Sequence, residues 1–255
     1  MAFLDPIFNP LMQPLLDASP FLAILVLSFL ISIIITLVYK LVTNQNEMKS
    51  LKEKQKEYQQ RMKELRSDPQ KMMSVQKEAM QLNMKYMKMS FKPTLITMIP
   101  LLLIFGWMSA HFAFEPINPG ESYSVTAFFS DSISGNAKLM VNDNNTKIIN
   151  GVEQPISKDG VTWNLKSEAG THYLTVKTDY MEQTKKVLVT TDNKYEEALT
   201  VYDHSDITKI NINYNALKPL GYSFSLFGWK PGWLGIYIIL SIVFSMALRK
   251  LLKIY

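Results

Sequence analysis

Two sets of side chains have the types and spacing of a binding surface. Hydroxyl groups and one ammonium group recur every four residues at Ser28, Ser32, Thr36 and Lys40, in a run that is otherwise apolar. Residues four apart share one face of a helix, so these groups form a continuous polar stripe. The stripe predicts a groove that admits water and polar groups. The alternative is that each hydroxyl bonds its own helix backbone or assists helix packing.

Two other apolar runs add hydroxyl groups to this predicted groove. One run holds Thr94 and Thr97, and the other holds Ser241 and Ser245, which are also four residues apart. Pro100 lies in the same run as the two threonines. A proline removes the hydrogen bond to the carbonyl four residues earlier, so we expect a helix kink there.

The second set is a group of methionines in a lysine-rich stretch. Met73, Met80 and Met87 are seven residues apart, and Met84 lies at helical spacing from the last two. Methionine is flexible and polarizable, and it recurs on surfaces that bind varied apolar partners. This spacing predicts a client-binding face. Packing on the protein's own membrane helices or on the bilayer, or simple tolerance of methionine in a helix, are the alternatives.

The chain offers little for covalent chemistry. It has no cysteine, which excludes disulfides, cysteine-ligated metals and thiol catalysis. The sequence also lacks the motifs of a phosphate-binding loop, a zinc protease or a serine hydrolase. His172 and His204 have no recognisable ligand spacing, so we expect surface or turn residues. We therefore predict no enzymatic activity, no cofactor and no metal. Separately, Asn144-Asn145-Thr146 is a glycosylation sequon, so Asn144 is a candidate glycosylation site.

Three long apolar runs must position these residues. We predict membrane-spanning helices at 20–42, 93–114 and 226–248, because each run has the length that crosses a hydrocarbon layer of ~30 Å. Buried core helices of a soluble protein are the alternative. The stretch before the first run has no Lys or Arg, so we do not expect a cleaved signal peptide.

Loop charges predict the orientation of these helices. Residues 43–92 carry 12 Lys or Arg against 6 Asp or Glu, whereas residues 115–228 carry 10 against 14. Basic loops stay in the cytoplasm. We therefore expect an extracytoplasmic N-terminal segment at 1–19 and a cytoplasmic tail at 249–255.

The basic segment 43–92 has the pattern of an antiparallel coiled-coil hairpin. Apolar residues step by three and four on both sides of an Ser-Asp-Pro turn, which is the spacing of a heptad seam. Asp68 is a good N-cap and Pro69 a good first residue for the second helix. The seam positions are Met48, Leu51, Gln55, Tyr58, Met62, Leu65, Met72, Val75, Ala79, Leu82, Tyr86 and Met89.

Residues 115–225 read as a β-rich extracytoplasmic domain. Six short runs are rich in β-branched and aromatic residues, and Gly, Asn and Asp clusters separate them. These runs are "SYSVTAFFS", "AKLMVN", "GVTWNLK", "HYLTVKTD", "KKVLVTT" and "ITKININY". About seven such strands predict an immunoglobulin-like sandwich. The expected fold class is thus a membrane α-helical protein with three spans, a cytoplasmic coiled-coil hairpin and an inserted β-sandwich.

This arrangement resembles the YidC/Oxa/Alb insertase superfamily, and most of all its archaeal YidC-like branch. The likeness is carried by "KPTLITMIPLLLIFGWM", by "GWLGIYIILSIVFSMALRKLLK" and by the methionine-rich hairpin. It covers residues 1–114 and 226–255 and leaves out the β-rich domain. YidC-type members place an arginine in their groove from the first core helix. Here that helix has no charge before Lys40, so the hydroxyl stripe must supply the polarity instead.

The resemblance implies an insertase and chaperone of membrane proteins with a groove open to the cytoplasm and no nucleotide hydrolysis. The implied partners are nascent membrane proteins, the ribosome, the lipid bilayer of the cell membrane and small membrane subunits, with no DNA. Two alternatives come from other classes. A receptor would couple the outer β domain to the coiled coil, and a cation channel would form as an oligomer.

Overall fold

The computed structural model describes residues 4–254 and separates into two compact units. The β unit comprises the described residues up to Pro20 together with residues 107–233. The helical unit comprises residues 21–106 and 234–254. We describe each unit by itself.

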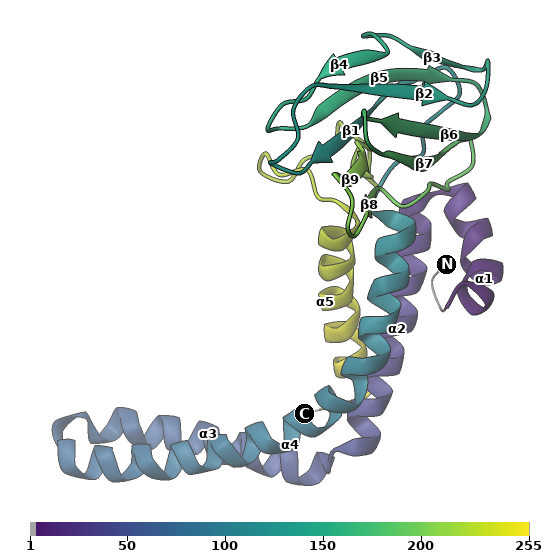
Figure 1. Cartoon of the computed structure of the whole chain (residues 1–255). Coiled ribbons are helices and arrows are strands. Elements are labelled where there is room, and N and C mark those ends of the chain that lie inside the picture. The colour runs from purple at the N-terminus through teal and green to yellow at the C-terminus, as the bar shows by residue number, and fades with distance from the viewer. Residues whose placement is uncertain (1–3, 255) are drawn as a thin grey trace. The chain divides into compact units, whose positions relative to one another are not determined.

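Three helices are long and apolar enough to cross a membrane: α2 (Pro20–Val42), α4 (Pro69–Phe112) and α5 (Trp233–Leu251). They lie side by side in the helical unit (Figure 1). Aromatic pairs join them. The rings of Phe29 and Phe244 are 5.2 Å apart, and those of Phe105 and Tyr237 are 5.0 Å apart. Edge-on aromatic contacts of this kind add to the packing of neighbouring helices.

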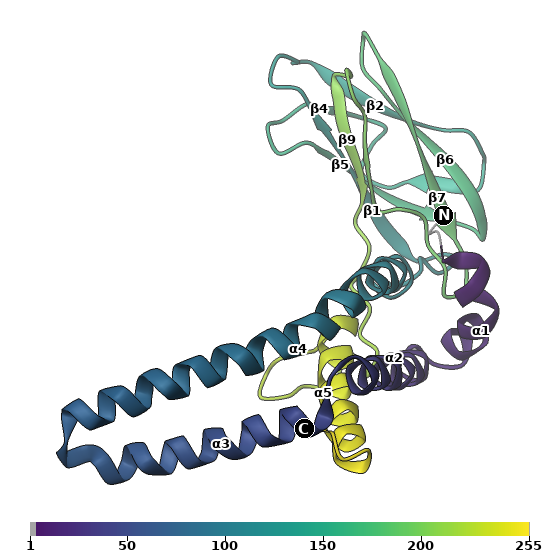
Figure 2. The same cartoon turned by 90° about the horizontal axis from the view of Figure 1, so that it is seen from below.

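The segment predicted as a hairpin contains α3 (Gln45–Glu64), a 3-10 turn (η1, Leu65–Ser67) and the first part of α4. Figure 2 shows α3 and α4 running antiparallel side by side. Gln55 Nε2 donates to Asn83 Oδ1 at 2.6 Å, and Lys85 pairs with Glu47 at 2.6 Å. All twelve predicted seam positions are buried or half-buried. Supercoiled knobs-into-holes packing stays a prediction.

The predicted cap between the two hairpin helices is confirmed. Asp68 Oδ1 accepts a hydrogen bond from the backbone N–H of Lys71 at 3.2 Å, and α4 begins at Pro69. Lys71 also reaches the Asp68 carboxylate with its ammonium group at 3.0 Å. This side-chain hydrogen bond lowers the pKa of Asp68. The carboxylate therefore stays ionised where the helix dipole favours a negative charge.

α4 runs without a break from the hairpin into the span, through the boundary expected between residues 92 and 93. Its 44 residues include Pro93 and Pro100. Each proline removes one ladder hydrogen bond, which permits bending, and α4 bends along its length in Figure 1.

α5 begins at Trp233, seven residues later than predicted. Residues 226–232 form a turn and an extended stretch instead. The reason is local. Phe227 and Gly228 both have positive φ, which a right-handed helix does not allow. Pro231 follows, and its ring would disrupt a helix that began at residue 226.

One helix was not predicted. α1 (Asp5–Ala18) occupies most of the segment 1–19, although it contains Pro10 and Pro14. Met12 and Leu16 are fully buried, and Trp107 Nε1 donates to Asn9 Oδ1 at 3.2 Å. The side chain of Asn193 donates to the carbonyl of Leu16 at 3.0 Å. These contacts make α1 part of the β unit.

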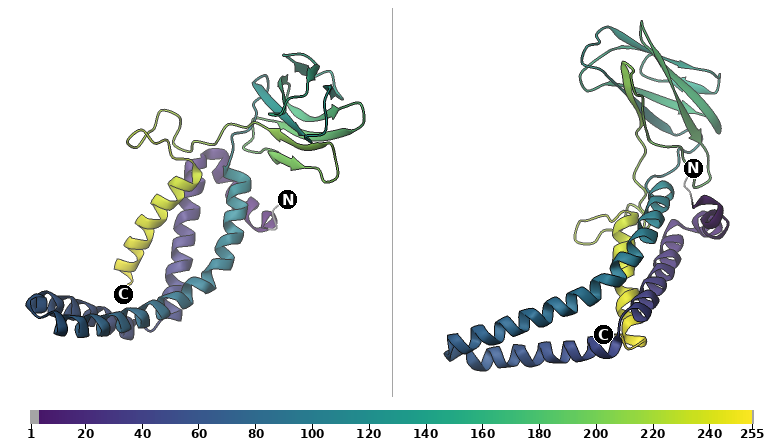
Figure 3. Two further views of the ribbon diagram at one scale, coloured as in Figure 1. Left: turned by 60° about the vertical axis from the view of Figure 1, so that its left-hand side comes forward. Right: turned by 60° about the horizontal axis from the view of Figure 1, so that its bottom comes forward.

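The β domain consists of two antiparallel sheets (Figure 3). The strand order is β3-β5-β1-β9-β8 in one sheet and β4-β2-β6-β7 in the other. All six strands predicted by sequence runs are present, and three short edge strands were missed. The bounds are β1 Ser122–Phe129, β2 Asn136–Val141, β3 Thr146–Ile148, β4 Glu153–Pro155, β5 Val161–Ser167, β6 Gly170–Lys177, β7 Glu182–Val189, β8 Leu199–Val201 and β9 Ile207–Ile212.

Both sheets contribute to one apolar core, in which Trp163 from one sheet and Leu139 from the other are fully buried. The prediction for His172 was wrong. This residue lies in β6, is 3% exposed and contacts Asp143 Oδ2 through Nδ1 at 2.7 Å. A carboxylate partner makes its burial possible. His204 does lie in a turn, with a φ of 55°. Asn144 is exposed in the loop between β2 and β3.

Candidate functional site

The four methionines form an exposed face on α4. Met73, Met80, Met84 and Met87 are 47% to 68% exposed, as expected for positions outside the seam. Lysine side chains lie between them, and two open depressions follow the face. One contains Met80 and Met84 with Lys77, Gln81, Lys85 and Lys88. The other contains Met87 with Lys88, Phe91, Lys92 and Leu95. The surface offers soft apolar contact bordered by positive charge.

All three candidate spans contribute to a polar cleft of about 220 Å³. We call it the polar cleft. α2 supplies Ile35 and Tyr39, α5 supplies Arg249, and α4 supplies Tyr86, Ser90, Pro93, Thr94 and Thr97. It is open at one side, and Arg249 is the one charged residue among those that line it. A guanidinium group beside several hydroxyl groups can bind a carboxylate or another polar group.

Aromatic and hydroxyl contacts hold the walls of the polar cleft together. The guanidinium carbon of Arg249 lies 4.8 Å from the centroid of the Tyr39 ring, in the range of a cation–π contact. The Tyr39 hydroxyl is 3.5 Å from Ser90 Oγ. Thr94 Oγ1 donates to the carbonyl of Ser90, and Thr97 Oγ1 donates to that of Pro93, both at 3.1 Å. Each threonine keeps acceptor capacity for a further polar group.

An apolar cleft adjoins the polar one. It has a volume of about 110 Å³, and Ile35 and Thr97 line both. Its other lining residues are Ile31, Ile34 and Val38 from α2 and Ile96, Pro100, Leu101 and Ile104 from α4. The two clefts therefore form one path between α2 and α4. The path is polar and positive near Arg249 and apolar beyond Thr97.

The structure places the predicted hydroxyl stripe elsewhere. Ser28, Ser32 and Thr36 are 0%, 1% and 3% exposed, on the face of α2 that packs inside the helical unit. They do not line either cleft. The Oγ atoms of Ser28 and Ser32 have no hydrogen-bond partner among residues 4–254. Small side chains at these positions let neighbouring helices approach closely, which is the packing alternative stated for single hydroxyls.

Some of the remaining predicted groove residues line a cleft and others do not. Thr94 and Thr97 line the polar cleft, and Pro100 lines the apolar cleft. Lys40 is exposed, and Ser241 and Ser245 are half-buried on α5. Lys40, Ser241 and Ser245 line neither the polar nor the apolar cleft. Of the predicted groove residues, the structure thus brings together only the two threonines of α4.

Sequence reasoning missed Arg249 as a site residue. The arginine follows the last apolar run, where a charge is ordinary and indicates only the end of a span. Its position beside Tyr39 depends on how α5 packs against α2, which no local spacing reports. The pair of Tyr39 and Ser90 was missed for the same reason. The only local signal was the aromatic Tyr39 directly before Lys40 at the end of an apolar run.

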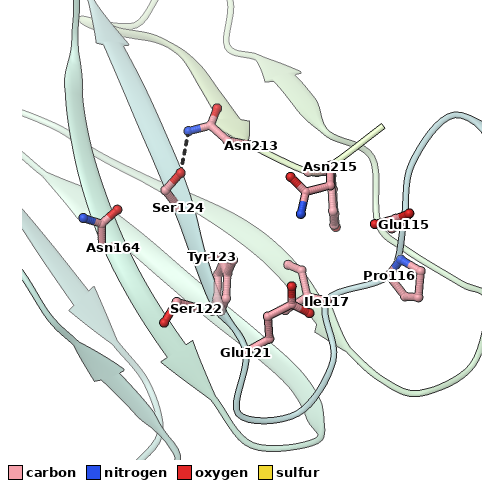
Figure 4. Close-up of a pocket in the computed structure, with 11 residues that line it drawn as sticks. Glu115, Pro116, Ile117, Glu121, Ser122, Tyr123, Ser124, Asn164, Asn213 and Asn215 are labelled. Carbon is pink, nitrogen blue, oxygen red and sulfur yellow. Dashed lines mark hydrogen bonds between the residues drawn. The ribbon is translucent and has the colours of Figure 1, made fainter. Parts of the chain in front are cut away.

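The β domain has a polar pocket of its own, of about 240 Å³ (Figure 4). Glu115, Glu121 and Asn215 lie at its rim, and Asn213 Nδ2 donates to Ser124 Oγ at 2.9 Å on its wall. Tyr222 donates to Glu115 Oε2 at 2.9 Å. Burial, followed by this hydrogen bond, raises the pKa of Tyr222. The pocket presents amide, hydroxyl and carboxylate groups together.

The fold and the adjoining clefts define a class: a membrane protein with three candidate spans, in which a polar and an apolar cleft adjoin between α2 and α4. Residues 5–131 match the model of a family described as integral membrane protein EMC3/TMCO1-like. Residues 5–131 are thus similar to an integral membrane family of the Oxa1/YidC-related insertase superfamily. The match includes α1 to α4 and β1, whereas α5 and the rest of the β domain lie outside it. No curated protein and no solved structure matches the chain.

Proposed function

We propose that this chain is a membrane-protein insertase of the archaeal YidC-like kind. It captures nascent apolar segments on the methionine face of α4 and passes them along the path between α2 and α4 into the bilayer. The single observation that carries the proposal is that two clefts adjoin, one polar beside Arg249 and the other apolar beyond Thr97. The relation of the EMC3/TMCO1-like family to membrane-protein insertion supports it.

The polar cleft lowers the barrier for the hydrophilic flank of a client. A charged residue at the centre of a bilayer costs on the order of 3 kcal/mol on insertion scales. A flank that rests against Arg249 and the threonine hydroxyls has replaced part of its hydration before it meets hydrocarbon. The remaining apolar distance is shorter than a full bilayer, so the cost is smaller.

The adjoining apolar cleft receives the client's hydrophobic segment. Ile31, Ile34 and Ile104 line this cleft. In this proposal its open side faces lipid. Transfer of apolar surface out of water supplies the driving force. The mechanism therefore needs no nucleotide, cofactor or covalent step, and the protein acts without being an enzyme.

The hairpin makes the first contact with the client. Methionine side chains adapt to apolar segments of different shapes, and the lysines between them attract acidic flanks. The excess of basic residues in 43–92 also favours contact with ribosomal RNA, which salt weakens. In this proposal the hairpin and the tail at 249–255 face the cytoplasm, and the β domain lies outside the cell membrane. Small membrane subunits that complete the path fit the same scheme.

Site-specific crosslinking to stalled ribosome–nascent chain complexes tests the proposed path. A photoreactive residue at Met84 or at Thr97 should crosslink to an apolar nascent segment. The matched control is the same residue at Ser32, which is buried away from both clefts. Crosslinks to lipid or to the protein itself alone, at Met84 and Thr97, would refute the path.

Changing the four methionines to glutamine tests the capture step separately. Glutamine has a similar helix propensity and length but lacks the apolar thioether. We expect severalfold weaker crosslinking of nascent chains at position 84, with unchanged helical content by circular dichroism. The corresponding leucine variant, which keeps the apolar surface, should retain capture. Equal capture by the glutamine variant would remove the methionines from the mechanism.

A receptor is the second candidate, and the polar pocket in the β domain is the observation that favours it. The two functions differ in what they need. An insertase with residues 115–225 replaced by a short flexible linker should still insert clients into vesicles. A receptor should lose its function with the same replacement. Insertion assays with the shortened and the full chain separate the two.

A further inference from the structure

The segment between β9 and α5 ends in a tight aromatic turn. Leu226 and Trp229 exchange two backbone hydrogen bonds, from Leu226 N to Trp229 O at 2.8 Å and from Trp229 N to Leu226 O at 2.9 Å. Phe227 and Gly228 are the two residues between them. The segment is the yellow-green loop in Figure 3. We call residues 222–229 the aromatic turn.

Phe227 occupies a backbone conformation in this turn that is unfavourable for a large side chain. Phe227 has a φ of 52° and Gly228 a φ of 85°. A two-residue turn with positive φ at both positions favours Asn-Gly, because a side chain larger than that of Gly or Asn crowds the backbone there. The Phe227 ring is nevertheless fully exposed. Strain combined with complete exposure indicates that the ring has a partner outside the chain.

The residues around Phe227 have the composition of a membrane–water interface. The side chains of Tyr222, Phe224 and Trp229 are all exposed. Lysines stand on both sides, at Lys218 and Lys230, and Lys218 Nζ donates to the carbonyl of Lys230 at 3.1 Å. Amphipathic aromatic rings with adjacent cations settle at the level of lipid headgroups.

Chain length brings the turn within reach of the bilayer. Phe227 is six residues before Trp233, the first residue of the candidate span α5. Six residues extend over at most ~20 Å. The turn is therefore tied to the end of a span and stays near the bilayer surface. A soluble partner would have to compete with lipid at that position.

We propose that the aromatic turn inserts Phe227 into the bilayer interface on the side of the β domain. Tyr222 and Trp229 then lie at headgroup level, and Lys218 and Lys230 face lipid phosphate. The partner is the lipid surface itself. The insertion gives the β unit a contact with the bilayer surface in addition to its chain connection to α5. This inference rests on the integral membrane assignment and does not depend on insertase activity.

The chain has no cysteine, so single thiols report cleanly on this proposal. Phe227→Cys and, as a matched control, Ile149→Cys are purified and reconstituted into lipid nanodiscs. Ile149 is an exposed apolar residue elsewhere on the β domain. We expect a membrane-impermeant maleimide to react with Cys at 227 at least tenfold more slowly than at 149. The thiol reports the position of the turn, which in this proposal Tyr222 and Trp229 still hold at the interface.

A second measurement separates lipid from protein as the cause of protection. Bimane attached at position 227 should be quenched by lipids that carry a spin label near the headgroup, and less by lipids labelled deep in the acyl chain. Bimane at 149 should be quenched by neither. Equal thiol reaction rates at 227 and 149 overturn the proposal. Slow reaction at 227 without quenching by labelled lipid also overturns it, because protein contact then explains the protection.

Discussion

The β domain and the helical unit bury their apolar side chains in different places. In the β domain, Trp163, Leu139 and Leu174 are fully enclosed between the two sheets. In the helical unit, Ile99, Leu102 and Leu41 remain more than half exposed. The first arrangement completes its own core, and the second needs hydrocarbon or a client around it. The comparison shows which half of the chain is a fold in itself and which half is completed by its surroundings.

A connected set of buried polar groups lies in the β domain, although the Tyr214 hydroxyl there is buried without a hydrogen-bond partner among the described residues. In the β domain, hydrogen bonds form a chain from Tyr123 to Ser167 at 2.8 Å, from Ser167 to Thr146 at 2.9 Å and from Thr146 to His172 at 3.0 Å. In the helical unit, Ser28 and Ser32 have no partner among the described residues. Buried polar groups in a self-contained core are hydrogen-bonded, because an unpaired one costs free energy. The helical unit tolerates the exceptions where small side chains allow close packing.

The largest effect should come from opening the β core. Trp163→Ala removes a fully buried ring and its hydrogen bond to the carbonyl of Val152, at 3.1 Å. We expect the free energy of unfolding of the β domain to fall by about 3–5 kcal/mol. Pulse proteolysis of the protein in nanodiscs at increasing urea concentration measures this. Val201→Ala, on an exposed edge strand, is the control and should change little. An unchanged urea midpoint for Trp163→Ala would contradict a self-contained core.

The next effect should fall on the polar cleft and leave stability unchanged. Arg249→Gln removes the charge but keeps a polar side chain. We expect about tenfold weaker binding of a client whose flank carries a carboxylate, or ~1.4 kcal/mol. Crosslinking from Thr97 measures it. Lys250→Gln is the matched control, because Lys250 is the neighbouring cation and does not line the cleft. Equal losses for both variants would mean that overall charge, rather than the cleft, binds the client.

A smaller effect should appear at Asp143. Burial acts to raise the pKa of Asp143, but the hydrogen bond from His172, with that from the Asn145 backbone, outweighs burial and lowers the pKa. A lowered pKa in the folded state contributes stability above the unfolded value of about 3.9, and the contribution is lost as the pH falls through the folded pKa. Because this carboxylate is partly exposed, we expect Asp143→Asn to cost about 1 kcal/mol at pH 7.

The pH dependence distinguishes this electrostatic effect from a packing effect. The difference in unfolding free energy between Asp143→Asn and the unchanged protein should shrink as the pH falls through the lowered folded-state pKa of Asp143, and disappear once the carboxyl group is protonated in both states. Urea unfolding of the β domain at several pH values measures the difference. A constant difference at every pH would show that packing, rather than the charge of Asp143, is responsible.

The smallest effect should come from Ser32→Ala. Its hydroxyl has no partner among the described residues, so removal should change stability by less than about 0.5 kcal/mol. Insertion of clients should also stay the same, because Ser32 lies outside both clefts. A loss of insertion activity greater than that of Thr97→Val would reverse the assignment and restore the serine stripe as the polar path.

The sequence predicted the elements well where one period dominates. The apolar run 20–42 coincides with α2, and the step of three and four residues identified positions in residues 48–89 that are all buried or half-buried. Alternation of residue types located six strands. β3, β4 and β8 were missed because each has only three residues, too few for alternation to be recognised. α1 was missed because its three prolines and two aspartates interrupt the apolar pattern from which a helix would be predicted.

The candidate site was harder to predict because it depends on contacts between helices. A spacing of four residues placed Ser28, Ser32 and Thr36 correctly on one face of α2. It could not determine whether that face meets another helix or an open cleft. Arg249 and Tyr39 are more than 200 positions apart in the sequence, and only packing brings them to 4.8 Å. Local patterns therefore identify faces, and the tertiary structure determines what each face meets.

The unbroken course of α4 has a mechanical consequence. At 1.5 Å per residue, the 44 residues of α4 extend over about 66 Å along the helix, so one continuous helix joins the far end of the hairpin to a wall of the path. Pro93 sits on that wall and is also the first point at which the ladder is weakened. A load applied to the far end of α4 is therefore transmitted along the helix to Pro93. In the proposed function, a client that pulls on the hairpin would also act on the width of the polar cleft.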